Sequence, residues 1–210
     1  MKLVCMSDLH MKMPTDVPSG DLLVIAGDLT SGGTHFQVMA MLQYLASLSD
    51  RFTHGVVMVA GNHDFLFQKD PAEAINLCET AGITYLCESG CMINGLNVWG
   101  SPYTPRFGGW AFMYDRHMKD QFWQRIPDDT DILITHGPPL GVMDSNFEGE
   151  HCGDEFLIGH VIERVKPKVH TFGHIHDGYG SFEYEGTTFV NCAQLNDLYE
   201  LANKPVEVEI

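Results

Sequence analysis

Residues 56–64 read Val-Val-Met-Val-Ala-Gly-Asn-His-Asp, an apolar run followed by a glycine and three polar residues. The apolar part, residues 56–60, is typical of a strand that is buried on both faces of a sheet. Asn62, His63 and Asp64 carry oxygen and nitrogen atoms of the kind that bind metal ions or move protons. The pattern therefore places candidate chemistry where a buried strand ends.

Other apolar runs in the chain end in the same way, each followed by a carboxylate or an imidazole. The runs are residues 3–6, 22–26, 132–134 and 169–172, and the polar residues after them are Asp8 and His10, Asp28, His136, and His174 and His176. The ends of neighbouring strands can meet at one edge of a sheet, so we expect these side chains to converge. Oxygen and imidazole donors together suit a divalent transition metal, and there are enough of them for two ions.

The spacing of these residues favours shared coordination. Asp8 and His10 are two positions apart, so in an extended segment both point to one side and can bind one ion. His174 and His176 repeat this spacing, and two such imidazoles are a stronger metal signal than either alone. Asp28 follows a glycine, and its two carboxylate oxygens can bridge two cations. The alternative for Asp28 is a structural turn, in which the side chain caps the next segment.

The residues of the Asn-His-Asp segment are expected to have different roles. Asn62 offers a metal a neutral carbonyl oxygen. We expect His63 to face a substrate and to stabilise or protonate a leaving oxygen, with Asp64 orienting its imidazole. The alternative is a tight turn without chemistry. His136 precedes a stiff Gly-Pro-Pro turn that would fix its direction, whereas a lone histidine at such a place is more often structural.

The alternation of strand and helix signals predicts an α/β chain, with a single domain over residues 1–210. Helices are expected over residues 34–49, 70–82, 116–125 and 154–165. Thr34 with Gln37 predicts a capping box for the first helix, and Asp70 with Glu73 predicts one for the second. Hairpin signals are Asn-Gly at residues 94–95 and Glu-Gly at residues 185–186. Parallel strands and antiparallel hairpins should therefore be mixed.

The composition limits the expected partners and compartment. The formal net charge is −16, with 12 Lys and Arg against 28 Asp and Glu, so neither a nucleic-acid duplex nor an anionic membrane is an expected partner. The apolar runs are far shorter than the roughly 20 residues that cross a bilayer, and Met1-Lys2 leads directly into a strand rather than a signal peptide. The six cysteines form no Cys-x-x-Cys pair, so we expect reduced thiols in a cytoplasmic protein.

Two long segments, residues 101–114 and 137–153, lack clear secondary structure and directly follow predicted strands. Segments of this length in a compact domain are usually functional or disordered, and we interpret them as the rims of a pocket. Arg106 in the first segment could pair with a phosphate, and His151 in the second could touch a substrate. A solvated arginine and a histidine without a role are the alternatives.

The ordered set of motifs resembles that of the calcineurin-like metallophosphoesterases. The motifs are Asp-x-His at 8–10, Gly-Asp at 27–28, Gly-Asn-His-Asp at 61–64, a histidine after a strand at 136 and Gly-His-x-His at 173–176. Two further pieces, Trp-Gly-Ser-Pro-Tyr-Thr-Pro at 99–105 and Gly-Glu-His-Cys-Gly at 149–153, are similar to a small subgroup, the metallophosphoesterase-domain-containing proteins. The resemblance implies a four-layer αββα sandwich, in which helices flank two mixed β-sheets.

The resemblance also implies which residues hold the metals. The first metal would be held by Asp8, His10, Asp28 and His176, and the second by Asp28, Asn62, His136 and His174. His63 would be the acid on the substrate side, with Asp64 behind it. Some relatives in the subgroup lose the last histidine of Gly-His-x-His and their activity with it, so the presence of His176 favours a working enzyme. Manganese is the favoured metal, with iron, zinc, cobalt and nickel as alternatives.

The expected reaction is hydrolysis of a small phosphodiester, with cyclic nucleotides as one candidate. Two ions would clamp the phosphoryl oxygens and share a bridging hydroxide that attacks phosphorus in line with the leaving group. The alternatives are a phosphomonoesterase of the same fold, a non-catalytic scaffold and a metal-binding sensor. Turnover of any phosphoester would separate an enzyme from the last two.

Overall fold

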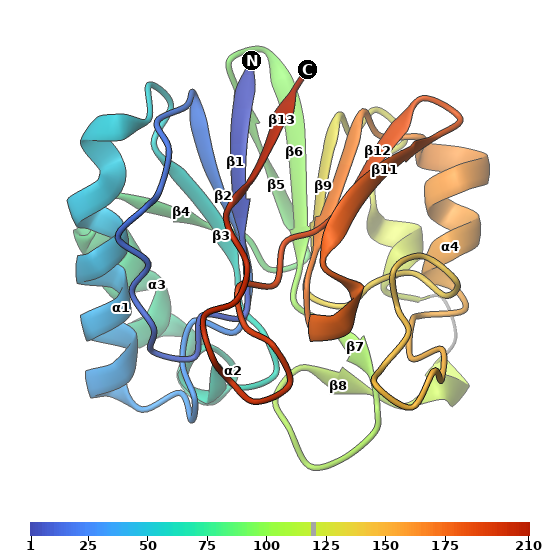
Figure 1. Cartoon of the computed structure of the whole chain (residues 1–210), viewed down its shortest axis with the longest axis horizontal. Coiled ribbons are helices and arrows are strands. Elements are labelled where there is room, and N and C mark those ends of the chain that lie inside the picture. Colours follow the sequence, from blue (N-terminus) through green and yellow to red (C-terminus); the bar gives the residue numbers. More distant parts are fainter. Residues whose placement is uncertain (119–120) are drawn as a thin grey trace.

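Two mixed β-sheets lie face to face at the centre of the molecule, with helical segments on their outer sides (Figure 1). The computed structural model describes residues 1–118 and 121–210. The four-layer α/β sandwich expected from the sequence is confirmed.

The first sheet has the strand order β13-β1-β2-β3-β4. Its strands are β1 (Lys2–Met6), β2 (Leu22–Ala26), β3 (Val56–Val59), β4 (Ile83–Tyr85) and β13 (Val206–Glu209). Strands β1 to β4 pair in parallel, and β13 pairs antiparallel with β1 at the edge. Strand β13 was not predicted, because its Val-Glu-Val-Glu sequence is short and buries only Val208 fully.

The second sheet has the strand order β11-β12-β10-β9-β6-β5. Its strands are β5 (Ser89–Ile93), β6 (Leu96–Ser101), β9 (Ile132–Thr135), β10 (Val169–Phe172), β11 (Gly180–Tyr184) and β12 (Thr187–Asn191). The inner strands are parallel, and β5 and β11 are antiparallel edge strands. Both predicted hairpin turns are confirmed, with positive φ at Asn94 and Gly95 and at Glu185 and Gly186.

Both faces of the first sheet are buried, which explains its continuous apolar runs. In β1, Leu3 and Cys5 pack between the two sheets, whereas Val4 and Met6 pack in a core that includes residues of the helices. The core between the sheets also contains residues of the second sheet, such as Ile134. The sheets are therefore fixed against each other by side chains that alternate along each strand.

Helices α1 and α3 cover the outer face of the first sheet (Figure 1). The helical segments on this side are α1 (His35–Leu48), η1 (Ser49–Arg51), α2 (Phe65–Lys69) and α3 (Pro71–Thr80). The capping box of Thr34 and Gln37 begins α1 as predicted. Asp70 caps α3, but the Glu73 side chain lies 2.9 Å from His35 Nε2 instead. The second predicted box is therefore only half formed.

Short helical turns cover the outer face of the second sheet. These turns are η2 (Arg116–Met118), η3 (Trp123–Arg125), α4 (Leu157–Gly159) and the π-helix η4 (His160–Val165). The continuous helix predicted over residues 116–125 is wrong for the described residues, because the adjacent rings of Phe122 and Trp123 are both buried in the same core. Lys119 and Asp120 of that prediction lie outside the described residues.

The helix predicted over residues 154–165 begins later than expected. The carboxylate of Asp154 accepts hydrogen bonds from the N–H groups of Phe156 and Leu157, so this residue caps the segment rather than joining it. The segment ends at Lys166, whose N–H donates to the carbonyl of Val161 over 2.9 Å.

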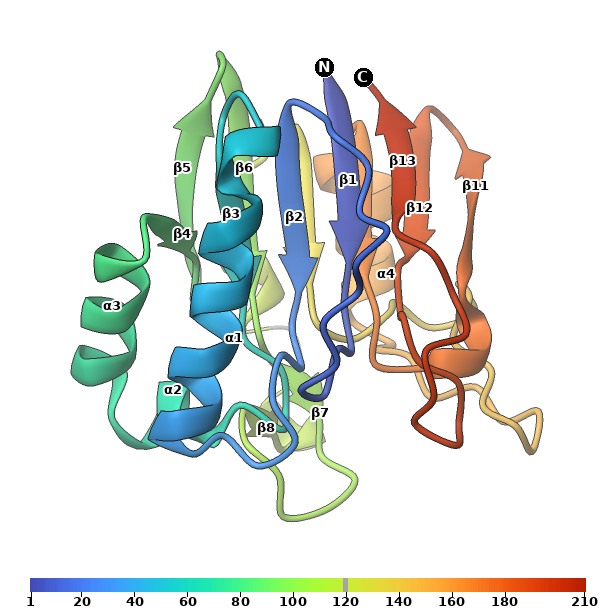
Figure 2. The same ribbon diagram turned by 60° about the vertical axis from the view of Figure 1, so that its left-hand side comes forward.

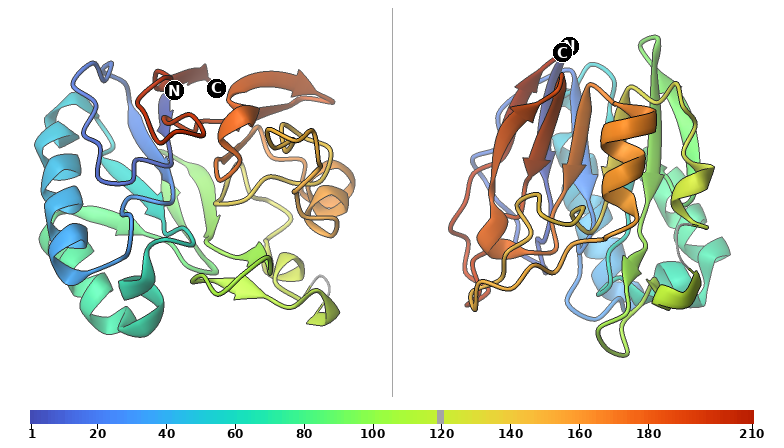
Figure 3. Two further views of the ribbon diagram at one scale, coloured as in Figure 1. Left: turned by 60° about the horizontal axis from the view of Figure 1, so that its bottom comes forward. Right: turned by 90° about the vertical axis from the view of Figure 1, so that its right-hand side faces the viewer.

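The parallel strands of both sheets end at one edge of the sandwich, the lower edge in Figures 1 and 2. Residues 101–114 fold back there as a small sheet of β7 (Thr104–Pro105) and β8 (Met113–Tyr114). Seen from this edge, the loops after β6, β9 and β12 surround the strand ends (Figure 3, left). The fold thus brings the predicted polar residues and the predicted rims to the same place.

All six cysteines are free, and Cys5, Cys78 and Cys192 among them are buried. In the described part of the chain, no helix has the length and apolar character needed to cross a membrane.

Candidate metal centre

The candidate ligands leave their strands through unusual backbone conformations. The φ angles of Asp8, His10, Asp28 and His174 are 52°, 40°, 52° and 68°. This left-handed region is strained for residues with a Cβ, and such strain gathers at functional sites. Asp8 and His10 therefore converge through a turn, and the prediction that they share one side of an extended segment is wrong.

Two glycines let the backbone approach the buried carboxylates. A Cβ at Gly61 would lie 2.2 Å from Asp28 Oδ1, and one at Gly173 would lie 2.1 Å from Asp8 Oδ2. Backbone N–H groups of the same two motifs donate hydrogen bonds to these oxygens, over 2.8 Å to Asp28 and 2.9 Å to Asp8. One oxygen of each carboxylate is thereby fixed, and the other is left to face the site.

Asp8, His10 and His176 form the first cluster of candidate ligands, with ligand atoms that lie within 4.8 Å of one another. Asp8 Oδ1 lies 3.6 Å from His176 Nε2, and His10 Nε2 lies 3.6 Å from Asp28 Oδ2. His176 Nδ1 donates to the carbonyl of Asn196 over 3.0 Å. Because the carbonyl holds Nδ1, the other ring nitrogen of His176 faces the cluster.

Asp28, His136 and His174 form the second cluster, again with ligand atoms within 4.8 Å of one another. Asp28 Oδ2 lies 3.5 Å from His136 Nε2, and Asn62 Oδ1 lies 2.8 Å from the same nitrogen. His136 Nδ1 donates to the carbonyl of Ala26 over 2.9 Å, which turns Nε2 toward the site. Asp28 Oδ2 is close to a histidine of each cluster and lies between the two.

Several atoms of the first cluster are buried without hydrogen-bond partners. Asp8 Oδ1 and both ring nitrogens of His10 have none within residues 1–118 and 121–210. Leaving a buried polar atom unsatisfied costs roughly 1–3 kcal/mol. A divalent cation would satisfy Asp8 Oδ1 and one of the two His10 nitrogens, and carboxylate and imidazole donors suit such an ion. The residues present therefore fit a metal centre.

The charges of the site keep several donors in forms that bind metals. Burial alone would raise the pKa of Asp28, but the imidazoles of His136 and His10 hold it below its ordinary value. Neighbouring imidazoles outweigh burial in the same way at Asp8, whose pKa is also lowered. Burial lowers the pKa of His174 to about 3, so this ring is neutral near pH 7 and keeps a lone pair.

Two imidazoles are instead held in the protonated form by carboxylates. Burial lowers their pKa, but Asp28 raises that of His136 and Asp8 raises that of His176, each to about 9. Metal ligands must be deprotonated, so a cation would displace the proton from these rings.

His63 borders the pocket beside the first cluster. Its ring centroid lies 4.6 Å from that of His10 and 4.2 Å from that of Trp110. Its Nδ1 donates to the carbonyl of Ser31 over 3.0 Å, so Nε2 remains available to a substrate. This arrangement suits the substrate-facing role expected of His63.

Asp64 has a structural position. Its buried carboxylate accepts hydrogen bonds from the hydroxyl of Thr30 and from the N–H groups of Leu29, Thr30 and Gly61, over 2.7–3.2 Å. Its hydrogen bonds in the described part of the chain do not reach the His63 ring, so the prediction that Asp64 orients this imidazole is wrong. Burial and the charge of Asp28 raise the pKa of Asp64 to about 6. The carboxylate ties the turn after β2 to the turn after β3.

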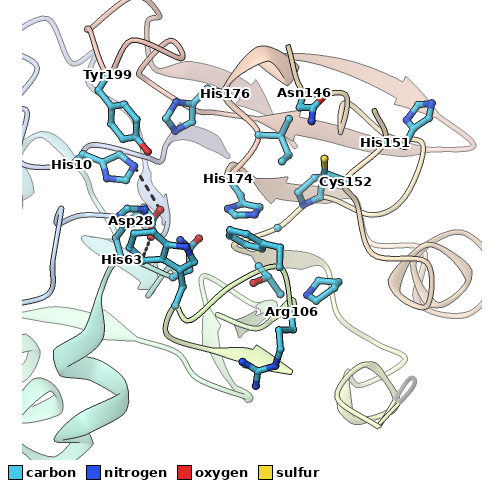
Figure 4. A pocket seen from close by; sticks show the side chains of 18 of the residues that line it. His10, Asp28, His63, Arg106, Asn146, His151, Cys152, His174, His176 and Tyr199 are labelled. Carbon is cyan, nitrogen blue, oxygen red and sulfur yellow. Dashed lines mark hydrogen bonds and ion pairs between the residues drawn. The ribbon is translucent and has the colours of Figure 1, made fainter. Parts of the chain in front are cut away.

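The two clusters open into a pocket of about 480 Å³ (Figure 4). Both long segments predicted as rims contribute lining residues, so that prediction is confirmed. Three aromatic side chains that no motif marked also line it: Phe107, Trp110 and Tyr199. Phe107 and Trp110 lie on a loop, and Tyr199 lies after the last motif. No sign of their role is visible in the sequence, because these rings approach the ligands only in the folded chain.

Residues 1–178 match the calcineurin-like phosphoesterase family. The chain belongs to this family. The human and mouse proteins named metallophosphoesterase domain-containing protein 1 are each 33% identical to the phosphoesterase over 233 aligned residues, which cover 100% of its chain and 71% of theirs. The solved structure of TT1561 of Thermus thermophilus has a TM-score of 0.64 at 15% identity, covering 90% of this chain and 88% of that one, and shows the same fold. The resemblance found from the motifs is confirmed, and it supports a metal-dependent phosphoester hydrolase.

Arg106 and His151, the two predicted substrate contacts of the phosphoesterase, line the pocket, but each is paired with a carboxylate. Arg106 pairs through Nε with Asp115, and Figure 4 shows its guanidinium directed away from the ligand clusters. His151 Nδ1 lies 2.7 Å from Asp144 Oδ1, and the ring is more than half exposed. Direct substrate contact by either residue therefore stays a prediction.

A buried hydrogen-bond cluster joins the two rims of the phosphoesterase. Asp154 Oδ2 accepts from the Tyr114 hydroxyl over 2.5 Å and from Trp123 Nε1 over 2.9 Å. Tyr114 ends the first rim, and Asp154 directly follows the second. The cluster therefore ties the end of the first rim to the chain just after the second.

Proposed function

We propose that the chain is a binuclear metal-dependent phosphoesterase that hydrolyses small phosphodiesters. The observation that carries the proposal is the position of Asp28 Oδ2, which lies 3.6 Å from His10 Nε2 and 3.5 Å from His136 Nε2. A carboxylate shared by two clusters can bridge two cations, and a pair of cations can clamp a phosphoryl group. His63 lines the same pocket as a candidate acid.

The seven candidate ligands divide between two ions that share Asp28. The first ion would be held by Asp8, His10, Asp28 and His176, and the second by Asp28, Asn62, His136 and His174. When bound, the ions supply Lewis acidity to the phosphoryl oxygens and to a water nucleophile. Mixed oxygen and nitrogen donors accept manganese, which we favour, and also iron, zinc, cobalt and nickel.

His63 is the residue that we propose acts on the leaving group. A protonated ring can give its Nε2 proton to the departing oxygen while Nδ1 keeps its hydrogen bond to the carbonyl of Ser31, 3.0 Å away. The ring therefore stays oriented before and after proton transfer. Asp64 supports this geometry from a distance, because it holds the turns that carry Asp28 and His63.

The charges around the pocket favour a diester over a monoester. The two arginines that line it are both paired with carboxylates, Arg106 with Asp115 and Arg116 with Glu155. A monoester dianion carries one more charge than a diester and would gain little from these neutralised side chains. The exposed rings of Phe107 and Trp110 instead offer apolar surface to a second organic group. Cyclic nucleotides have this combination of a single charge and a planar group.

The decisive experiment compares bis-p-nitrophenyl phosphate with p-nitrophenyl phosphate, using metal-stripped protein with and without added manganese. We expect manganese-dependent turnover with a higher kcat/KM for the diester. His63→Asn should lower kcat about 100- to 1,000-fold while the protein keeps its manganese. His54→Asn, a histidine outside the pocket lining, is the matched control. No turnover of either ester would remove the enzyme proposal, and a preference for the monoester would reverse the substrate class.

We also propose that residues 1–210 act as one domain in a reducing compartment such as the cytoplasm. Side chains of both sheets share one core, which supports a single unit. The six free cysteines support a compartment in which thiols stay reduced.

A further inference from the structure

Two loops beside the pocket share one backbone framework. They are residues 146–150, with the sequence Asn-Phe-Glu-Gly-Glu, and residues 196–200, with the sequence Asn-Asp-Leu-Tyr-Glu. In each loop the first N–H donates to the last carbonyl over 3.0 Å, and the fourth N–H donates to the first carbonyl over 2.8–2.9 Å. In each, the asparagine Oδ1 accepts from the third and fifth N–H groups over 2.9–3.0 Å. The loops therefore differ mainly in their side chains.

The fourth position of this framework has a left-handed backbone in both loops. Its occupant is Gly149 in one loop, with φ of 80°, and Tyr199 in the other, with φ of 59°. Glycine adopts this conformation freely, whereas a tyrosine is strained there. The loop at residues 146–150 therefore forms the same framework without strain, because glycine occupies its fourth position. A bulky side chain held against backbone strain points to a contact that matters for function.

The strained position aims the tyrosine at the first cluster. The Tyr199 ring centroid lies 4.9 Å from that of His10 and 5.4 Å from that of His176, edge-on to both. Figure 4 shows the phenol reaching into the pocket between these rings, with its hydroxyl on the side of Asp28. The loop is linked to the cluster, because the carbonyl of Asn196 accepts a hydrogen bond from His176 Nδ1 over 3.0 Å.

The hydroxyl of Tyr199 is not used to stabilise the described part of the fold. It forms no hydrogen bond with residues 1–118 or 121–210, and about half of the side chain is exposed. The side chain lines the main pocket and also the smaller hollow beside it. Packing against two histidines needs only the ring, so a phenylalanine would serve equally if packing were the whole role. The hydroxyl is therefore free to bind what enters the pocket.

We propose that Tyr199 is a substrate-binding residue whose hydroxyl donates a hydrogen bond to a phosphoryl oxygen held at the first cluster. The inference rests on the proposed function, since it requires a phosphoryl group beside these ligands. A phosphoryl oxygen carries negative charge, and a hydroxyl donor complements it without adding a cation to the site. The ring meanwhile shields His10 and His176 from solvent.

The test measures binding of inorganic phosphate to manganese-loaded protein by calorimetry, together with kcat/KM for bis-p-nitrophenyl phosphate. Tyr199→Phe keeps the ring and loses only the hydroxyl. We expect its phosphate dissociation constant to rise about ten-fold, as for the loss of a hydrogen bond to a charged group. Its kcat/KM should fall by a similar factor, and its bound manganese should match the wild type. Leu198→Ala, which removes an exposed side chain in the same loop, is the matched control.

A second pair of variants tests the strain. Tyr199→Gly should lose phosphate affinity as Tyr199→Phe does, yet its urea midpoint should be at least that of Tyr199→Phe, because the left-handed backbone is relaxed. Gly149→Ala places a side chain at the twin position, so its urea midpoint should fall while phosphate binding stays at the wild-type level. This contrast would show that Tyr199 is retained for binding rather than stability.

Unchanged phosphate affinity in Tyr199→Phe would overturn the proposal, and so would a wild-type protein that binds manganese but no phosphate. The proposed function fails separately, if the wild type binds phosphate but hydrolyses no diester. In that case the loss of phosphate affinity in Tyr199→Phe would still support a phosphoryl-binding tyrosine.

Discussion

The two ligand clusters lie at the same edge of the sandwich, but their buried polar atoms differ in whether the protein itself gives them hydrogen bonds. In the second cluster both ring nitrogens of His136 are hydrogen-bonded, one to the carbonyl of Ala26 and one to Asn62 Oδ1. In the first, Asp8 Oδ1 and both ring nitrogens of His10 are buried without a hydrogen-bond partner in the described chain. The His136 ring is therefore satisfied by the protein itself, whereas the buried atoms of Asp8 and His10 leave room for an ion to bind.

The positions of the two histidines in the fold explain this difference. His136 directly follows a strand of the second sheet, and its ring reaches the end of β2 in the first sheet. It therefore joins the sheets, and it is fully buried. His10 lies in a turn after β1, with the rings of His63 and Tyr199 as its neighbours. The loss of a ligand that also joins the two sheets should therefore lower stability more than the loss of a ligand in a turn.

Replacing Asp28 with Asn would disrupt both clusters at once, so it should have the largest effect. The amide keeps the size of the side chain but loses the charge that faces His10 and His136. We expect kcat/KM for the diester to fall at least about a thousand-fold, and bound manganese, measured by elemental analysis, to fall with it. Asp16→Asn removes an exposed carboxylate and should change neither quantity. Near-normal turnover in Asp28→Asn would refute a shared carboxylate.

Alanine substitutions at His136 and His10 would separate the clusters by stability. In metal-stripped protein, His136→Ala leaves a cavity and buried acceptors without a donor, so the free energy of unfolding should fall by about 3 kcal/mol. His10→Ala also leaves a cavity, but the nitrogens that it removes form no hydrogen bond with the described residues, so the loss should be smaller, about 1–2 kcal/mol. Urea unfolding measures both values. Equal losses of unfolding free energy would mean that the hydrogen bonds of His136 add nothing to stability.

The sequence predicted the strands and the candidate ligands because both signals are local. A strand that is buried on both faces is apolar at every position, as β2 shows, and the ligand motifs follow such strands within a few residues. The hairpin turns at residues 94–95 and 185–186 were predictable for the same reason. The backbone geometry of the ligand turns was missed, because positive φ at Asp8 and His10 is imposed by packing, and so was the edge strand β13.

The groups that support the ligands could not be predicted from the sequence. The carbonyls of Ala26, Ser31 and Asn196 fix three histidine rings, yet every residue has a carbonyl and none of them is marked in the sequence. Asp64 was expected to orient its neighbour, His63. It instead directs its carboxylate inward from the start of α2, so adjacency in sequence was misleading.

Manganese should stabilise the wild type more than it stabilises a protein with a defective first cluster. At free manganese about 100 times the dissociation constant, binding adds about 2.7 kcal/mol to the free energy of unfolding. In His10→Ala this gain should be at least about 1 kcal/mol smaller, because the first ion has lost a ligand. Thermal unfolding with manganese and with a chelator measures the gain. An undiminished gain in His10→Ala would show that His10 does not bind the ion.

Removing the hydroxyl behind Asp8 should have the smallest effect and should act on one cluster only. Ser7 Oγ donates to Asp8 Oδ2 over 2.6 Å, so it orients the carboxylate whose other oxygen faces the site. Groups that orient a ligand typically change metal affinity about 10- to 100-fold. Because a backbone N–H also holds this oxygen, we expect Ser7→Ala to weaken one of two manganese-binding steps about ten-fold and leave the other unchanged. Ser47→Ala, which removes an exposed hydroxyl, is the control. If both binding steps weakened equally, the two clusters would not bind manganese independently. The different hydrogen bonding of His10 and His136 would then have no consequence for metal binding.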